Sequence, residues 1–166
     1  MAEKIYIFVV EDEPEVLDAI VRDISGFEDT FPIEMADTAE EAKELITELL
    51  DEGGEIGLIL CDHVLPGQNG VDLLVDMQKD SRTRKTKKVL ITGQAGLDET
   101  VRAVNKADLE HYIAKPWNKE ELVGITKKLL TDYVLDNGEN PIAYMQVLDS
   151  ERIADEIRKG KGITDS

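Results

Sequence analysis

Five short apolar runs, each followed by a segment with helical spacing, constrain the fold of this chain more than any other feature. The first run, residues 4–10, is nearly continuous and rich in β-branched and aromatic side chains, which is typical of a strand buried on both faces. Weaker runs follow at residues 31–36, 57–61, 88–92 and 111–114. Strands that alternate with helices at this spacing predict an α/β fold, with a doubly wound parallel sheet covered on both faces.

Local signals mark where the helices begin. Pro14 suits a first helical position, and Thr38 with Glu41 forms a capping box before the second helix. Asn118 with Glu121 resembles another capping box before the last helix of the alternating region. Two further helices are predicted, over about residues 71–79 and 97–105.

The alternation ends near residue 135, which divides the chain into two parts. Residues 136–141 read Asp-Asn-Gly-Glu-Asn-Pro, a cluster of turn formers. Beyond it, the apolar positions predict one or two short helices that are too small to bury a core alone. We therefore expect one domain over residues 1–135 and a C-terminal extension or linker over residues 136–166.

Composition narrows the choice of partners. The 166 residues contain 36 Asp and Glu against 19 Lys and Arg, a net charge of −17. This charge repels nucleic acid and anionic lipid, so direct binding to nucleic acid or to a membrane is not expected. No apolar run approaches the roughly 18 residues of a membrane span, and no secretory signal is recognisable, so a cytoplasmic location is expected. The single cysteine, Cys61, cannot form an internal disulfide.

One segment is basic, in contrast to the acidic composition of the whole chain. Residues 79–88 hold six Lys or Arg side chains in ten residues. A charge run of this kind is usually solvated. We therefore predict an exposed loop that flanks a strand.

Acidic residues stand where the first and third strands are predicted to end. Glu11 and Asp12 directly follow the first strand, and Asp62 directly follows the apolar run of the third. In an open parallel sheet, sites form beyond the carboxyl ends of the strands, where the winding reverses. If these strands are neighbours, the three carboxylates converge, and either some keep their protons or a hard divalent cation lies between them. The oxygen-only ligand set favours magnesium.

Two further strand ends supply a hydroxyl and an ammonium group. Thr92 stands at the end of the fourth strand, and Lys115, which precedes Pro116, stands at the end of the fifth. Opposite a metal-bound carboxylate, these groups make a pocket for a dianion such as a phosphoryl group. A carboxylate in that pocket can itself act as the nucleophile and form an aspartyl phosphate, and Asp62 is the one so placed.

The pieces of this pattern occur together and in order within residues 4–132. They are Glu11-Asp12, the segment Asp-His-Val-Leu-Pro-Gly-Gln-Asn-Gly at residues 62–70, Thr92-Gly93, and Tyr-Ile-Ala-Lys-Pro at residues 112–116. Together they resemble the receiver (CheY-like) domain of two-component response regulators, and at this spacing they are highly specific. The resemblance implies a flavodoxin-like (βα)5 fold with strand order 2-1-3-4-5.

The resemblance also implies a function, that of a phosphorylation-activated switch in a phosphorelay rather than a turnover enzyme. Asp62 would accept a phosphoryl group from a sensor histidine kinase or a phosphotransfer protein. Thr92 and Lys115 would hold the phosphoryl oxygens, and Tyr112 would be the switch aromatic that acts with Thr92. The domain would catalyse only its own phosphorylation and dephosphorylation.

A cofactor and partners follow from the same resemblance. Magnesium, with manganese as an alternative, would be bound by the carboxylates of Glu11, Asp12 and Asp62 and by the backbone carbonyl of Val64. Phosphorylation would alter the surface made by the fourth helix, the fifth strand and the fifth helix. That surface would bind a downstream protein partner or form a homodimer.

Two positions vary from the family pattern. Glu11 stands where many members have Asp, which bears on the affinity for the metal. In many members, polar side chains at the positions of Val64 and Gln94 place the water that hydrolyses the aspartyl phosphate. The aliphatic Val64 therefore predicts a comparatively long-lived phosphoryl group.

Other classes of function stay open from the residues. The main alternative is a phosphohydrolase or phosphotransferase with an Asp nucleophile on an α/β sheet. Enzymes of the haloacid-dehalogenase type want a second Asp two residues after the first, where this chain has Val64. A structural module that has lost phosphorylation is another, and intact Asp62, Thr92 and Lys115 argue against it. Neither a glycine-rich dinucleotide turn nor a P-loop occurs, which weakens a nucleotide-binding enzyme.

Overall fold

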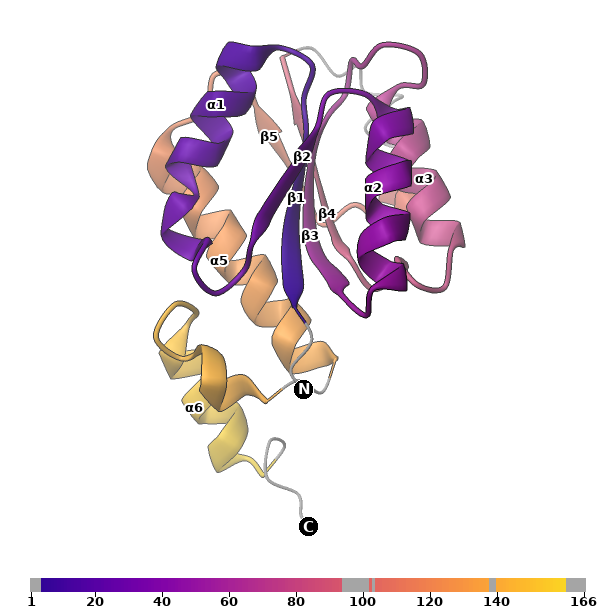
Figure 1. Cartoon of the computed structure of the whole chain (residues 1–166). Coiled ribbons are helices and arrows are strands. Elements are labelled where there is room, and N and C mark those ends of the chain that lie inside the picture. Colours follow the sequence, from indigo (N-terminus) through magenta and orange to yellow (C-terminus); the bar gives the residue numbers. More distant parts are fainter. Residues whose placement is uncertain (1–3, 94–101, 103, 138–139, 161–166) are drawn as a thin grey trace.

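The computed structural model of the chain describes residues 4–93, 102, 104–137 and 140–160, and Figure 1 shows a sheet flanked by helices. The sheet has five parallel strands in the order β2-β1-β3-β4-β5. The strands are β1 (Ile5–Val10), β2 (Ile33–Ala36), β3 (Glu55–Asp62), β4 (Lys87–Thr92) and β5 (His111–Ala114). The predicted α/β fold and its strand order are confirmed.

Helices cover both faces of the sheet. In Figure 1, α1 and α5 lie on one face, and α2 and α3 lie on the other. The described helical elements are α1 (Pro14–Asp23), η1 (Ser25–Phe27), α2 (Ala39–Asp51), α3 (Gly70–Lys79), α5 (Lys119–Asp136), η2 (Pro141–Tyr144) and α6 (Ser150–Arg158). The helix predicted over residues 97–105 falls largely outside the described residues. None of the described helices has the length and apolar character needed to cross a membrane.

The helix starts predicted at Pro14, after Thr38 and after Asn118 are confirmed. Pro14 is the first residue of α1. The side chains of Thr38 and Asn118 each accept a hydrogen bond from the backbone N–H of the third residue of the helix that follows. Asn69 caps α3 in the same way, although the sequence pattern did not reveal that cap. Each cap satisfies an N–H group that has no partner within the first helical turn.

Side chains alternate along β1 and enter two apolar layers. Ile7 and Val9 belong to the α1–α5 layer, the apolar residues between the sheet and α1 and α5. Phe8 and Val10 belong to the α2–α3 layer, on the opposite face of the sheet. All four side chains are 0% exposed. A strand with both faces buried lies inside the sheet, which explains why the first apolar run of the sequence is nearly continuous.

An irregularity near the start of β3 explains a glycine inside that strand. The pairing of β1 with β3 shifts between Tyr6 and Ile7, which leaves Gly57 without a partner in the register. A Cβ atom at Gly57 would lie 2.6 Å from Cγ2 of Ile5. Only glycine leaves room for this close approach of the two strands.

The C-terminal extension packs against the end of the sheet that carries the start of β1 (Figure 1). Leu148 and Ile153 are 2% and 0% exposed and belong to the α1–α5 layer. The ring of Tyr144 stacks on Phe31, with the ring centroids 5.3 Å apart. The predicted short helices are therefore present, and they enlarge a core that they could not form alone.

The prediction of an exposed loop over residues 79–88 is wrong for Lys88. This residue lies in β4 and is 1% exposed. Its ammonium group donates to Oε1 of Gln78 at 2.9 Å and to the backbone carbonyls of Arg84 and Thr86 at 3.2 and 2.9 Å. Burial lowers the pKa of Lys88 to about 8, and the three bonds satisfy the donors of the buried group.

Candidate functional site

Three carboxylate groups meet at one edge of the sheet, which we call the acidic edge. Glu11 and Asp12 follow the last residue of β1, and the neighbouring β3 ends on Asp62. Oxygen atoms of the three groups lie within 4.8 Å of one another. The structure thus brings together the acids that the sequence predicted to converge.

Lys115 lies between two of these acids. It directly follows β5, and its ammonium nitrogen is 3.0 Å from Oε1 of Glu11 and 3.1 Å from Oδ1 of Asp62. The peptide bond between Lys115 and Pro116 is cis. Because Glu11 and Asp62 are 1% and 6% exposed, salt in the solvent screens these ion pairs only weakly.

Burial and hydrogen bonding set the ionisation of this site. Burial raises the pKa of Glu11, against the hydrogen bonds that its carboxylate accepts from Lys115 and from the N–H of Glu13 at 3.1 Å. Burial acts to lower the pKa of Lys115, but hydrogen bonds to Glu11 and Asp62 outweigh it and the pKa is raised. The ammonium group therefore stays charged. Desolvation raises the pKa of the neighbouring Cys61 thiol, which keeps that buried side chain uncharged.

Thr92 and Tyr112 lie on β4 and β5, the two strands that follow β3 in the order of the sheet. Thr92 ends β4 and is 3% exposed. Its backbone carbonyl accepts a hydrogen bond from the N–H of Lys115 at 2.9 Å, so the two residues predicted to hold the phosphoryl group are adjacent. Tyr112, on β5, is 45% exposed and belongs to the surface.

Two more residues were predicted to influence hydrolysis. Val64 stands two residues after Asp62 and is 67% exposed, so its side chain lies at the molecular surface. An aliphatic side chain at this place offers no hydrogen bond to a water molecule. Gln94 lies outside the described residues.

The donor atoms of the acidic edge fit a hard divalent cation. Magnesium is bound in proteins by oxygen ligands, chiefly one or two carboxylates. Glu11, Asp12 and Asp62 place one carboxylate oxygen each within 4.8 Å of the others. No nitrogen or sulfur ligand belongs to this described cluster, which also favours magnesium over zinc.

Gly70 holds the segment after Asp62 in place, a role that the sequence did not reveal. It begins α3, and its N–H donates to the carbonyl of His63 at 2.8 Å. A Cβ atom at Gly70 would lie 1.9 Å from the carbonyl oxygen of Asp62, far inside van der Waals contact. The signal available in the sequence was an Asn-Gly pair before a helical segment.

Trp117 ties the segment after β5 to α1. Its indole N–H donates to Oδ2 of Asp23 at 2.9 Å, and its ring packs against the α1–α5 layer. The two partners are 94 residues apart, so no local pattern signals the contact.

A parallel sheet of this order, with acids and a lysine at its carboxyl edge, defines the receiver class of α/β proteins. The sequence matches the response regulator receiver domain over residues 7–127, and the chain belongs to this family. Receiver domains are signalling switches of two-component systems rather than classical enzymes, and the family binds magnesium at an acidic pocket. The predicted resemblance is confirmed.

Several known proteins are similar to this chain. It is 29% identical over 126 residues to the phosphate regulon transcriptional regulatory protein PhoB of Escherichia coli, a match that covers 75% of this chain and 51% of PhoB. It is 29% identical over 118 residues to the chemotaxis protein CheY1 of Helicobacter pylori, covering 70% and 89% of the two chains. The crystal structure of a CheY-like receiver domain protein from Methanospirillum hungatei aligns with a TM-score of 0.69 at 28% identity, covering 81% of this chain and 100% of that one. The chain spans about half the length, or less, of the transcriptional regulators that it matches.

Proposed function

We propose that this receiver is a phosphorylation-activated switch in which Asp62 accepts a phosphoryl group from a sensor histidine kinase or a phosphotransfer protein. The position of Lys115 carries the proposal, since its ammonium nitrogen is 3.1 Å from Oδ1 of Asp62 and 3.0 Å from Oε1 of Glu11. A cation held against a buried carboxylate is an arrangement that stabilises the charge of a transferred phosphoryl group.

The transfer exchanges one bond to phosphorus for another. A carboxylate oxygen of Asp62 attacks the phosphorus atom of a phosphohistidine. The O–P bond forms as the N–P bond breaks, and the imidazole nitrogen keeps the electron pair of the broken bond. Lys115 and the hydroxyl of Thr92 stabilise the charge on the phosphoryl oxygens. Attack by water later restores the carboxylate, so the domain catalyses only its own phosphorylation and dephosphorylation.

The acidic edge would hold magnesium during this reaction. The ligands would be the carboxylates of Glu11, Asp12 and Asp62 and the backbone carbonyl of Val64. The bound ion supplies positive charge that offsets the charge of the phosphoryl oxygens. Lys115 offsets the charge of the phosphoryl group from the side of β5. The carboxylate of Asp62 can therefore accept this doubly negative group without net repulsion.

The signal would reach the surface through Thr92 and Tyr112. Phosphorylation can change a surface only by favouring one of two arrangements of the protein. Thr92 is buried next to the site, and Tyr112 is exposed on the adjacent strand. A displacement of Thr92 would therefore reach the surface through Tyr112. The altered surface is that of helical residues 104–107, β5 and α5, where a downstream protein or a second copy of the chain binds.

Mass spectrometry tests the phosphoacceptor. After incubation with acetyl phosphate and magnesium, we expect one base-labile phosphoryl group on Asp62. Asp62→Asn removes the nucleophile but keeps the shape, so the label should vanish. Asp51→Asn, an exposed position on α2, is the matched control and should keep the label. Label at the same site count in Asp62→Asn would overturn the assignment, and many turnovers of free phosphate would indicate the phosphohydrolase instead.

Light scattering tests the switch. Beryllofluoride with magnesium mimics the phosphoryl group, and we expect it to change the dimerisation of the wild type. Thr92→Ala should abolish this response. Phosphorylation of Asp62 should be slower in the variant, because the hydroxyl that stabilises the phosphoryl oxygens is lost, but it should still occur, because the nucleophile and Lys115 remain. If the partner is another protein, light scattering of the chain mixed with that protein should show the same dependence on beryllofluoride. Unchanged dimerisation and partner binding in the wild type would remove the switch from the proposal.

A further inference from the structure

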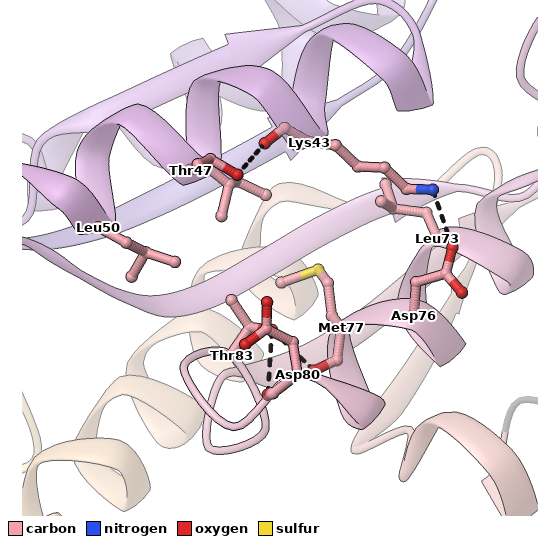
Figure 2. A pocket seen from close by; sticks show the side chains of 9 residues that line it. Lys43, Thr47, Leu50, Leu73, Asp76, Met77, Asp80 and Thr83 are labelled. Carbon is pink, nitrogen blue, oxygen red and sulfur yellow. Dashed lines mark hydrogen bonds and ion pairs between the residues drawn. The ribbon is translucent and has the colours of Figure 1, made fainter.

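A pocket lies between α2 and α3, apart from the acidic edge (Figure 2). Its volume is about 280 Å³, close to the lower end of small-molecule sites, which begin at roughly 300 Å³. Its described lining comes from α2, from α3 and from the loop after α3, and includes no residue of the acidic edge. The phosphoryl chemistry of the family therefore does not explain this pocket.

The floor of the pocket is part of the core. Ile46, Leu73 and Met77 are 4%, 0% and 5% exposed and belong to the α2–α3 layer. In Figure 2, Leu50 of α2 and Met77 of α3 point toward one another across the space. Because core side chains are held by their close-packed neighbours, this floor is preformed and apolar.

Two threonine hydroxyls line the pocket and can act there only as acceptors. Thr47 donates its hydrogen to the carbonyl of Lys43 at 2.8 Å, and Thr83 donates to the carbonyl of Met77 at 2.7 Å. A hydroxyl has one hydrogen, so each can offer only oxygen lone pairs to a ligand. The pocket walls thus favour a hydrogen-bond donor.

Carboxylates stand at both ends of the pocket. At one end, Oδ2 of Asp76 accepts bonds from the ammonium group of Lys43 at 2.8 Å and from Gln68 at 2.9 Å. Burial acts to raise the pKa of Asp76, but these bonds outweigh it and lower the pKa, so the group stays ionised. At the other end, Asp80 is exposed, and its Oδ1 accepts the N–H of Arg82 at 2.9 Å. Two carboxylates and one ammonium group give the lining itself a net negative charge, and the cations Lys79 and Arg82 lie near the carboxylates but outside the lining.

We propose that the pocket binds a small organic cation, an ammonium or guanidinium group carried on an aromatic or short aliphatic body. The body lies on the apolar floor, and the cationic group meets the acceptors of Asp80, Thr47 and Thr83. The net charge of −17 and the two carboxylates disfavour an anion. The volume of about 280 Å³ suits a small molecule rather than a peptide that would run along the two helices.

Titration of the isotope-labelled chain, followed by backbone amide shifts, tests this site. Phenethylammonium is the cationic probe, and 2-phenylethanol and phenylacetate are neutral and anionic probes of similar size. We expect saturable shifts of α2 and α3 amides around the pocket with phenethylammonium. The neutral probe should bind about tenfold more weakly, because a charged hydrogen bond is lost. Phenylacetate should cause no saturable shifts of these amides.

Three variants localise the binding. Thr47→Leu fills the pocket from an exposed helical position, so it should abolish binding while the rest of the spectrum stays that of the wild type. Asp80→Asn keeps the shape and should weaken binding by about tenfold. Glu48→Gln removes a carboxylate from α2 outside the pocket lining and is the matched control. Asp62→Asn should bind as the wild type does, which separates this site from the proposed phosphorylation.

Three outcomes would overturn the proposal. The first is equal affinity for the three probes, which would remove the charge preference. The second is binding that survives Thr47→Leu, which would place it elsewhere. The third is a set of shifts centred on Glu11 and Asp12, which would show that the probe is attracted by the acidic edge.

Discussion

Lys115 balances two carboxylates that are almost completely removed from water. Glu11 and Asp62 are 1% and 6% exposed, and the ammonium nitrogen lies 3.0 and 3.1 Å from one oxygen of each. Without that cation, the carboxylates of Glu11 and Asp62 would repel each other in a medium of low dielectric constant. The lysine thus places a positive charge beside Asp62, the proposed nucleophile, and offsets the repulsion between the two carboxylates.

Val64 gives the first residue-scale prediction, which concerns the lifetime of the phosphoryl group. Val64→Asn adds a side chain that can position water, so the aspartyl phosphate should decay roughly tenfold faster, about 1.4 kcal/mol of barrier. Loss of label at fixed magnesium concentration measures the rate. Ile142→Asn, at an exposed aliphatic side chain of the C-terminal extension (58% exposed), is the control for adding a polar side chain at the surface. Decay rates that agree between wild type and Val64→Asn would mean that the 67%-exposed Val64 only faces solvent.

At the scale of elements, the first turn of α3 and the end of β3 fit together through Gly70. Gly70→Ala would place a methyl group 1.9 Å from the carbonyl oxygen of Asp62 in the present backbone, so the strand end or the helix must move. We expect a loss of about 1–3 kcal/mol in the free energy of unfolding. Slower phosphorylation by acetyl phosphate should accompany it, because Asp62 shifts.

A second glycine provides the control for this substitution. Gly124 lies within α5, and a Cβ atom there would meet nothing within 4 Å. Gly124→Ala should therefore stabilise the chain by about 0.5–1 kcal/mol, since alanine loses less backbone entropy in a helix. Urea unfolding of both variants measures the contrast. A Gly70→Ala protein as stable as the wild type would show that the contact at Asp62 relaxes without cost.

The C-terminal extension should unfold together with the rest of the chain. Ile153→Ala removes a side chain that is 0% exposed in the α1–α5 layer, and we expect a loss of about 2–4 kcal/mol in the free energy of unfolding. Ile142→Ala, at a side chain in the same extension that is 58% exposed, should cost less than about 0.5 kcal/mol. Urea unfolding followed by circular dichroism measures both. Equal small losses would indicate an extension that adds no stability to the core.

The sequence predicted this extension only in part. Its short helices followed from the apolar spacing, and the break near residue 136 followed from turn formers. Its docking depends on distant partners, because Tyr144 stacks on Phe31 and Arg152 forms an ion pair of 2.6 Å with Asp132. Contacts between residues far apart in the chain leave no periodic signal.

For the whole molecule, the sheet and its acidic edge were predictable because both follow from local patterns. The continuous apolar run of β1 predicts a strand covered on both faces, and an acid directly after a strand must lie at the carboxyl edge. Lys88 was not predictable in this way. Within a cationic run it reads as solvated, yet its acceptors on Gln78, Arg84 and Thr86 exist only once α3 and β4 are packed.

This buried lysine makes the stability of the folded chain depend on pH. Burial lowers the pKa of Lys88 from 10.5 to about 8, although the nearby Asp108 and Glu110 oppose the shift. Lys87 acts in the same direction as burial. Between these two pKa values the unfolded chain binds more protons than the native chain, so the contribution of Lys88 to stability rises with pH.

Comparison with Lys88→Met isolates this contribution, because methionine keeps an apolar stem and cannot titrate. The free energy of unfolding of the wild type, minus that of the variant, should rise by about 2 kcal/mol between about pH 7 and about pH 9.5. The unpaired acceptors left in the variant lower its stability by an amount that does not depend on pH, so they do not alter the slope. Urea unfolding at the two pH values gives the difference, and Lys85→Met, at an exposed position of the same segment, controls for the loss of charge. A difference that stays constant over this range would show that folding does not penalise the charged form of Lys88, and that its three hydrogen bonds fully replace the water that it lost.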